Sequence, residues 1–232
     1  MRQYRILAII CILVVSYLTG VEQVRGQNDL NGAENGAGWE LLFNGKNMDG
    51  WNVKTPGSWI AEDGVITCKG RGDLYNDRKL GNFFLQVDFK VADGCNSGIY
   101  IRCADPAKRS DTSFEIQIIA DYDRTPGYHT TGSIYDRMKP TAKAVKPHGE
   151  WNELLVLCLD NQIKIHLNDI QIIDADMNDW DRPFVNPDGT WNKFKVAMKY
   201  LPREGFLGFQ SHGDDTGDNI WLRSIKVLEL KD

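Results

Sequence analysis

The stretch Asn96-Ser97-Gly98-Ile99-Tyr100-Ile101-Arg102 decides the fold, because its apolar residues alternate with polar or small ones. Phe114-Glu115-Ile116-Gln117-Ile118-Ile119 and Gly208-Phe209-Gln210-Ser211-His212 repeat the alternation. Successive side chains of a strand point to opposite faces, so the pattern predicts strands that bury one face in a core. If the strands share a sheet, the other face gathers polar side chains typical of a sugar-binding groove: Tyr100, Arg102, Glu115, Gln117, Gln210 and His212.

Most of the chain after Gly38 has the same short-strand character, and no amphipathic helix is predicted. The pair Asn168-Asp169 predicts a hairpin between strands at residues 162–167 and 170–174. The other predicted strands are residues 39–43, 59–61, 65–69, 83–91, 97–102, 114–119, 151–159, 193–198, 206–210 and 220–230. Many short strands without intervening helices are typical of an all-β fold, an antiparallel β-sandwich or jelly roll.

The N-terminus has the features of an export signal. A basic leader is followed by an apolar run at residues 6–18, which is shorter than the ~20 residues of a membrane span. We therefore expect residues 1–26 to be a signal peptide, with an uncleaved anchor as the alternative, and no stable membrane span. Residues 27–38 are rich in Asn, Gly and Ala and are expected to be a flexible linker, and residues 39–232 a single domain. The protein is expected in the periplasm or outside the cell.

Charge and cysteine content narrow the partners and the chemistry. The net charge of −5, with scattered Lys and Arg, argues against nucleic acid as a partner. Export permits disulfides, and four cysteines follow the leader, so three pairings are possible beside the alternative of buried thiols: Cys68, Cys95, Cys103 and Cys158. A Cys-x-x-Cys metal motif is absent from the sequence.

Several motifs together resemble a known family. They are Leu42-Phe43-Asn44-Gly45-Lys46, Asn96 to Arg102, Glu115-Ile116-Gln117, Thr131-Gly132-Ser133-Ile134-Tyr135, Lys146-Pro147-His148-Gly149-Glu150-Trp151-Asn152 and Gly208-Phe209-Gln210-Ser211-His212-Gly213. From about residue 39 to residue 230 the chain resembles the 3-keto-disaccharide hydrolase domain family, a concanavalin A-like jelly roll. The resemblance implies an exported bacterial enzyme that acts on glycosides oxidised at C3. Asp169 stands at a common glycine position, and residues 214–219 lengthen a loop; these departures from the family pattern concern substrate choice more than fold.

Glucanases of similar jelly-roll shape use a Glu-x-Asp-x-x-Glu strand, and this chain departs from it. Gln117 and Ala120 stand where the second and third carboxylates would follow Glu115. An ordinary glycosidase needs two carboxyl groups, ~5–5.5 Å apart for retention or ~6.5–9.5 Å for inversion. One carboxylate beside an amide cannot form that pair.

A 3-keto sugar removes the need for the pair, because its carbonyl acidifies the C2 hydrogen and the C1 oxygen can then be eliminated. Such a site needs a base, an acid for the leaving group and a donor for the enolate oxygen. Glu115 and His212 are the candidates for base and acid, in either order, and Arg102 is the candidate donor. The candidates for substrate binding are Asn96, Tyr100, Gln117, Tyr135, Trp180 and Gln210.

Each candidate has a simpler alternative. Glu115 and Arg102 could form a structural ion pair in the core, His212 could be an ordinary loop residue, and Trp180 could anchor its loop. No metal or cofactor is predicted, although acidic clusters at residues 174–181 and 214–218 could hold a structural calcium ion. The alternative to an enzyme is a lectin-like domain that binds carbohydrate without turnover.

Overall fold

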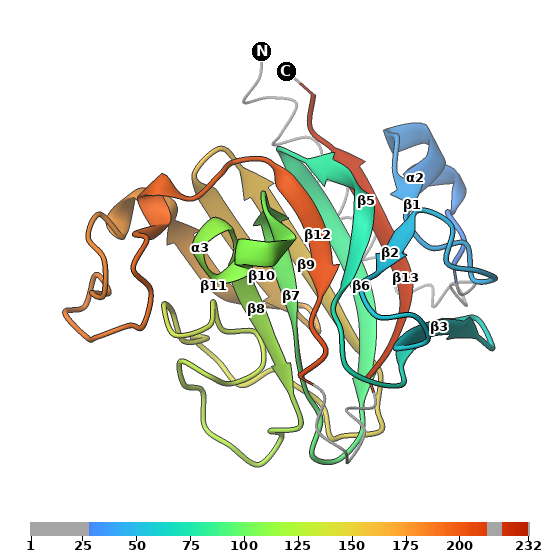
Figure 1. Ribbon diagram of the computed structural model, residues 1–232, viewed down its shortest axis with the longest axis horizontal. Helices are drawn as coiled ribbons and strands as arrows, with labels where there is room; N and C mark the ends of the chain where they lie inside the picture. The colour runs from blue at the N-terminus through green and yellow to red at the C-terminus, as the bar shows by residue number, and fades with distance from the viewer. Residues whose placement is uncertain (1–27, 213–219, 232) are drawn as a thin grey trace.

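The computed structural model describes residues 28–212 and 220–231, and it forms two antiparallel β-sheets stacked as a jelly-roll sandwich (Figure 1). The larger sheet has the order β11-β10-β9-β6-β13-β4-β3, with β1 paired to β13. Its strands are β1 (Glu40–Leu41), β3 (Trp59–Glu62), β4 (Val65–Cys68), β6 (Phe83–Val91), β9 (Asn152–Leu159), β10 (Gln162–Leu167), β11 (Ile170–Asp176) and β13 (Ile220–Glu229). The five-stranded sheet has the order β2-β5-β12-β7-β8. Its strands are β2 (Trp51–Val53), β5 (Leu74–Leu80), β7 (Asn96–Cys103), β8 (Phe114–Ile119) and β12 (Gly205–Phe209).

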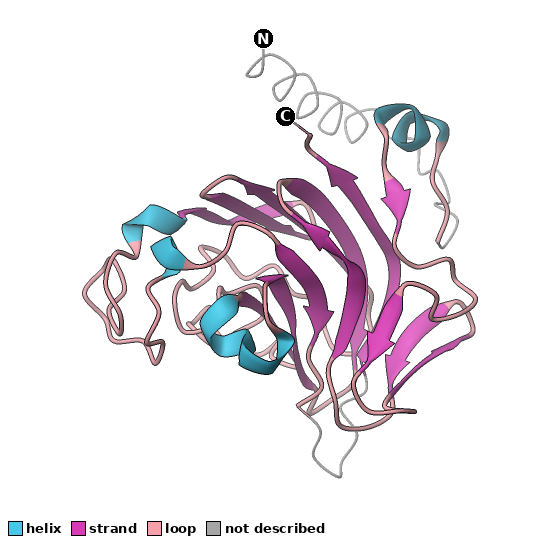
Figure 2. Cartoon of the chain, turned by 45° about the horizontal axis from the view of Figure 1, so that its top comes forward, coloured by secondary structure: helices cyan, strands magenta, loops and turns pink. Residues whose placement is uncertain are grey.

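Helices in the described part of the chain are short and lie outside the sheets (Figure 2). They are α2 (Gly32–Ala37), α3 (Arg109–Thr112) and the 3-10 turns η1 (Pro106–Lys108), η2 (Met177–Asp179) and η3 (Met198–Tyr200). In residues 28–212 and 220–231 no helix has the length and apolar character that crossing a bilayer requires. The predicted signal peptide at residues 1–26 lies outside the described residues.

The core lies between the sheets, where the predicted alternation places it. The apolar side chains of the three diagnostic stretches are 0–1% exposed and belong to one core cluster: Ile99, Ile101, Ile116, Ile118 and Phe209. Burying each such side chain stabilises the fold by roughly 1.5–3 kcal/mol relative to leaving it in water. The predicted all-β sandwich is confirmed, and the outer face of the five-stranded sheet is the one that can carry polar side chains.

The predicted hairpin is confirmed as β10 and β11, and its turn explains why Asp169 is tolerated. Asn168 and Asp169 both have positive φ angles, 49° and 68°. Two consecutive left-handed residues make the turn whose twist matches that of the flanking strands. Asn and Asp enter this region more easily than other non-glycine residues. Asn168 Nδ2 also donates to the Ala144 carbonyl at 2.8 Å, which fixes the turn.

Two strands were missed and one was predicted wrongly. β2 and β5 were not expected, because β5 includes Asn76-Asp77-Arg78-Lys79, a polar run without apolar alternation. Tertiary contacts hold this run in the sheet, since Arg78 pairs with both Glu40 and Glu229. Residues 193–198 are not a strand. They follow Trp191, which forms an isolated bridge with Val185, and they lead into η3.

Residues 28–38 differ from the flexible linker that composition suggested. Asn31 and Glu34 form a capping box on α2, and Glu34 pairs with Lys226 of β13. Asn28 is 7% exposed and donates to the Gly64 carbonyl at 2.8 Å. Short polar side chains that cap a helix or bond to a neighbouring strand order a segment that its composition alone would leave mobile.

The cysteines follow the alternative of buried thiols. All four are buried, and Cys68 Sγ donates to the Gly70 carbonyl at 3.1 Å. Cys103 and Cys158 form no disulfide, and burial raises the pKa of each thiol, to about 12 for Cys158. Both thiols are buried, whereas a reactive cysteine is at least partly exposed.

Candidate active site

Polar side chains gather on the outer face of the five-stranded sheet, the face turned away from the core cluster. Tyr100 of β7 and Glu115 of β8 are direct cross-strand partners, and Gly98 pairs with Gln117 beside them. Gln210 extends β12 and donates from its amide to the Tyr100 hydroxyl. The predicted wall of polar groups therefore includes Tyr100, Glu115, Gln117 and Gln210.

Arg102 does not belong to this wall, because a β-bulge turns it to the other face. Phe206 of β12 pairs with Cys103 of β7, and Gly208 pairs with Tyr100. One residue lies between the paired positions in β12 and two lie between them in β7, so β7 has one extra residue. Arg102 carries the strain of the bulge with a φ of 52°. An extra residue resets the alternation, so Cys103 shares the face of Tyr100 and Arg102 does not.

The Arg102 guanidinium serves the structure instead. The residue is 1% exposed, and its three nitrogens donate to the Gly81 carbonyl at 2.8 Å, the Asp160 carbonyl at 2.7 Å and Asn82 Oδ1 at 3.1 Å. These acceptors lie on two turns of the larger sheet, before β6 and after β9. Arg102 is thus a buried clamp between loops and forms no ion pair with Glu115, so both sequence-based interpretations of Arg102 were wrong.

Tyr100 is the centre of the network on the outer face. Its hydroxyl accepts hydrogen bonds from Arg109 Nε at 2.8 Å and Gln210 Nε2 at 2.6 Å. Both lone pairs of the phenol oxygen are then used, so its hydrogen is left to donate. Burial, helped by the charge of Glu115, raises the pKa of Tyr100. Tyr100 therefore stays a neutral hydrogen-bond donor at physiological pH.

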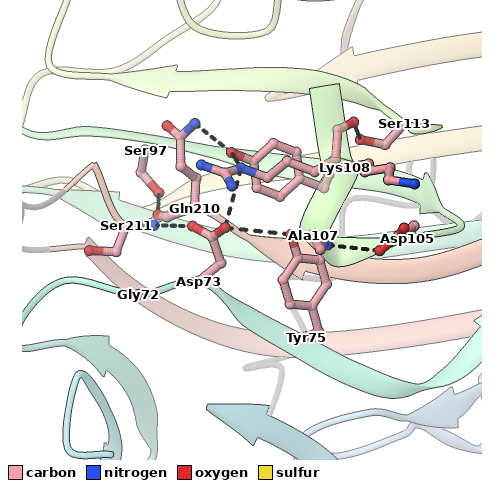
Figure 3. Close-up of polar contacts among 12 residues, drawn as sticks. Gly72, Asp73, Tyr75, Ser97, Asp105, Ala107, Lys108, Ser113, Gln210 and Ser211 are labelled. Atoms are coloured by element: carbon pink, nitrogen blue, oxygen red, sulfur yellow. Dashed lines mark hydrogen bonds and ion pairs between the residues drawn. The ribbon is translucent and has the colours of Figure 1, made fainter. Parts of the chain in front are cut away.

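Asp73 holds the arginine of this network in place. Arg109 Nε lies 3.3 Å from Asp73 Oδ2, and the side chain of Asp73 is only 5% exposed. Figure 3 shows Asp73 between Ser211, whose backbone N–H donates to Oδ1 at 3.3 Å, and Tyr75, whose hydroxyl donates to Oδ2 at 3.5 Å. With both oxygens occupied, Asp73 positions Arg109 and is not a second free carboxylate.

Glu115 is the free carboxylate of the site. It is partly buried, and no ion pair reaches it within residues 28–212 and 220–231. Burial raises the pKa of Glu115 to about 7, against the lowering effect of Lys193 and Arg109. A Cβ atom on Gly98 would collide with the Glu115 carboxylate, so the glycine leaves the space that this side chain occupies. Near neutral pH such a carboxyl group can both accept and return a proton.

Gln117 and Asn96 lie beside the carboxylate. Turned so that its nitrogen faces Glu115, the Gln117 amide donates to Oε1 and to the Ser97 carbonyl, both at 3.2 Å. Asn96 Oδ1 lies 3.2 Å from the Gln117 amide. The Gln117 amide therefore contacts Glu115, and Asn96 contacts Gln117 in turn.

Tyr135 and Lys193 close the side of the site next to β8. The backbone N–H of Tyr135 donates to the Glu115 carbonyl at 2.9 Å, and its ring lies 4.7 Å from the His129 ring. Lys193 Nζ sits 4.3 Å from the centroid of the Tyr135 ring. The Tyr135 backbone is thus bonded to that of Glu115, and the charge of Lys193 lowers the pKa of the Glu115 carboxyl group.

His212 and Trp180 are placed differently from each other. His212 is exposed just beyond β12, and no hydrogen bond or ion pair joins it to another described residue. Trp180 is 4% exposed and donates from Nε1 to Asn186 Oδ1 at 3.0 Å. Trp180 is the loop anchor that the sequence left as an alternative, and it offers no free face to a sugar.

The acidic loop at residues 174–181 does not collect its carboxylates. Asp174 pairs with Lys164 at 2.7 Å, and Asp176 accepts from the Asn161 and Gln162 amides. Within residues 28–212 and 220–231, no three His, Cys, Asp or Glu side chains group as ligands for a metal ion. The second acidic cluster includes residues 214, 215 and 218, which lie outside the described residues.

The sequence patterns did not single out three charged residues that the structure brings to the site: Asp73, Arg109 and Lys193. Arg109 lies in a segment expected to be a loop, and its α3 helix packs beside β7 (Figures 1 and 2). Each of the three is a single charged residue outside the diagnostic stretches, and such residues are too common in the sequence for one to be singled out. Tertiary contacts bring these three residues together, and the periodicity of apolar residues in the sequence does not indicate such contacts.

The carboxylate of Glu115 makes stability depend on pH. Because its folded pKa is raised from about 4.5 to about 7, the folded state keeps a proton that the unfolded state has lost between these values. Stability is therefore expected to fall as pH rises through this window, by roughly 3 kcal/mol from this group. Urea denaturation at several pH values should show that Glu115→Gln removes this fall. Parallel pH curves for the two proteins would contradict the shifted pKa.

Comparisons with known proteins agree with the fold. A model of the 3-keto-alpha-glucoside-1,2-lyase-like domain matches residues 38–228. A 3-keto-disaccharide hydrolase of Bacteroides thetaiotaomicron is 27% identical over 83% of this chain and 79% of that protein. Two crystal structures of candidate glycosyl hydrolases from Parabacteroides distasonis are also similar. One is 32% identical over 83% of this chain and 99% of that chain, with a TM-score of 0.75. The other is 27% identical over 89% and 100%, with a TM-score of 0.73. The chain belongs to the family of 3-keto-alpha-glucoside-1,2-lyase-like domains.

Proposed function

We propose that this protein is an exported enzyme that cleaves 3-keto-glycosides by elimination followed by hydration, which amounts to hydrolysis of the glycosidic bond. The observation that carries the proposal is a single free carboxylate, Glu115, with a pKa raised to about 7 beside donors held by buried groups. The name of the Bacteroides relative and the matching family model support the substrate class. The second carboxylate in the cluster, Asp73, is occupied by Arg109.

The first half-reaction begins at C2 of the oxidised sugar. Glu115 takes the C2 proton, and the electrons of that C–H bond form the C2–C3 double bond of an enolate. Arg109 and the Tyr100 hydroxyl, which are held together by the hydrogen bond from Arg109 Nε, would be the donors to this negative oxygen. The enolate oxygen then becomes the C3 carbonyl again, the C2–C3 electrons form a C1–C2 double bond, and the C1–O bond breaks. Its electron pair leaves with the departing oxygen, which takes a proton.

The second half-reaction adds water to the unsaturated product. The water oxygen bonds to C1, and the proton returns to C2, so the C3 ketone is preserved. The Glu115 carboxyl group, protonated in the first half and partly exposed, exchanges its proton with solvent between the two halves and then supplies the proton to C2. A group with a pKa near 7 suits both directions, because it neither holds nor releases the proton too strongly.

His212 is the candidate for the acid that protonates the leaving oxygen, on the basis of its place beyond Gln210 at the open end of β12. An acid matters most when the leaving group is a poor one. We therefore expect His212→Ala to lower turnover of a methyl 3-keto-glucoside about 10²-fold. Turnover of the p-nitrophenyl 3-keto-glucoside should change by less than about threefold, since p-nitrophenolate leaves without help. Equal losses on both substrates, or no loss on either, would remove His212 from this role.

The proposal is tested by incubating the purified protein with the α and β anomers of p-nitrophenyl 3-keto-glucoside and measuring release of p-nitrophenol. Release from a 3-keto substrate, above the spontaneous rate and without release from the unoxidised glucosides, is the expected result. Binding of the 3-keto sugar without release would instead make the protein a carbohydrate-binding domain. Equal release from oxidised and unoxidised glucosides would contradict the role of the ketone.

A further inference from the structure

Residues 191–195, called the rim segment below, present a row of exposed side chains next to the site. Trp191, Lys193 and Lys195 are exposed, whereas Asn192 between the first two is 3% exposed. Trp191 is 68% exposed, which is a large apolar surface left in water. Scattered exposed apolar residues are ordinary, so position and rigidity decide whether this one has a role.

Hydrogen bonds on the inner side fix the rim segment. Asn192 donates from Nδ2 to Asn186 Oδ1 at 2.9 Å and from its backbone N–H to the Phe184 carbonyl at 3.0 Å. The Lys193 N–H donates to Asp136 Oδ2 at 2.7 Å. The backbone on either side of the buried Asn192 is therefore held, and Trp191 is presented at the surface by an ordered segment.

The exposed residues of the rim segment lie along the edge of the site around Glu115. Lys193 Nζ lies over the Tyr135 ring at 4.3 Å. Lys195 Nζ pairs at 2.8 Å with Asp111 of α3, the helix that also supplies Arg109. Trp191 is the next exposed residue of this row beyond Lys193, so it extends the row outward from the site.

We propose that Trp191 is the stacking platform for the leaving sugar ring of a disaccharide substrate, an inference that rests on the proposed function. A pyranose presents a face of C–H groups, and the flat indole offers the matching apolar surface. The reacting 3-keto ring would lie over Glu115 and Tyr100, and the second ring would extend across Lys193 onto the indole. The rim segment would thus select disaccharides over glycosides with small aglycones.

Binding measurements separate this platform from catalysis. Calorimetry on the full chain would compare the 3-keto derivatives of trehalose, maltose and cellobiose with the methyl 3-keto-α- and β-glucosides. The Glu115→Gln background keeps the substrates intact, and Trp191→Ala is compared in that background with Tyr200→Ala. Tyr200 is a matched control, because it is also 68% exposed and lies outside the rim segment.

We expect Trp191→Ala to raise the dissociation constant of at least one disaccharide about tenfold and to leave both methyl glucosides within about twofold. Tyr200→Ala should change neither class. The platform is overturned if no disaccharide binds more tightly than its methyl counterpart, or if the preference survives Trp191→Ala. Both outcomes can be read whether or not the wild type releases p-nitrophenol, so failure of the platform and failure of the proposed function are distinguishable.

Discussion

Glu115→Gln is expected to lower kcat/KM on a 3-keto-glycoside by about 10²–10⁴-fold, the range that a positioned base contributes. The amide keeps the size of the side chain and cannot accept the C2 proton. Because the group has a pKa of about 7, wild-type kcat/KM should rise as pH increases through that value, and the residual activity of the variant should not. Initial rates of p-nitrophenol release across pH measure both effects.

A matched carboxylate-to-amide change separates the role of Glu115 from the loss of a charge. Glu150 is exposed in a turn far along the chain from β8, and Glu150→Gln should leave kcat/KM within about twofold. Substrate binding by calorimetry should survive Glu115→Gln, since Gln117, Tyr100 and Gln210 remain in place. Full activity in the Glu115→Gln variant would exclude this residue as the base.

Arg102→Ala should destabilise the fold by roughly 3–5 kcal/mol, because it empties a large buried site and leaves buried acceptors without donors. The acceptors are the Gly81 and Asp160 carbonyls and Asn82 Oδ1. Urea denaturation measures the loss. The matched control Arg182→Ala removes a guanidinium that is 73% exposed, and it should change stability by less than about 0.5 kcal/mol.

The same variant tests the assignment of Arg102 to the structure and not to the chemistry. Folded Arg102→Ala protein, assayed at low temperature and low denaturant, should keep kcat within about threefold of wild type, because the side chain points away from Tyr100 and Glu115. A variant of normal stability that had lost turnover would show that the guanidinium reaches the substrate.

Strand periodicity was sufficient to predict one wall of the site. Glu115 and Gln117 lie on alternate positions of β8, Gln210 directly follows β12, and the apolar residues beside them are buried: Ile116, Ile118 and Phe209. Alternation is a local property of an extended backbone, so it survives as long as the pairing stays regular. Tyr100 follows the same rule up to the bulge.

Beyond the bulge the rule fails for a physical reason. A single extra residue in β7 moves Arg102 to the opposite face, and a positive φ in an arginine has no sequence signature comparable to that of glycine. Asp73 and Arg109 come from separate segments, and only folding brings them together at Tyr100. The sequence also could not place Trp180, because an aromatic residue in a polar loop can be buried as easily as exposed; in the structure it is buried.

The central claim is that Glu115 moves the proton at C2, and solvent exchange tests it most directly. A 3-keto-glycoside incubated in D₂O with wild-type protein should return product that carries deuterium at C2, as NMR would show, and Glu115→Gln should not raise this exchange above the spontaneous rate. Glycosidic cleavage by the wild type with hydrogen retained at C2, or unchanged exchange in the Glu115→Gln variant, would contradict the account.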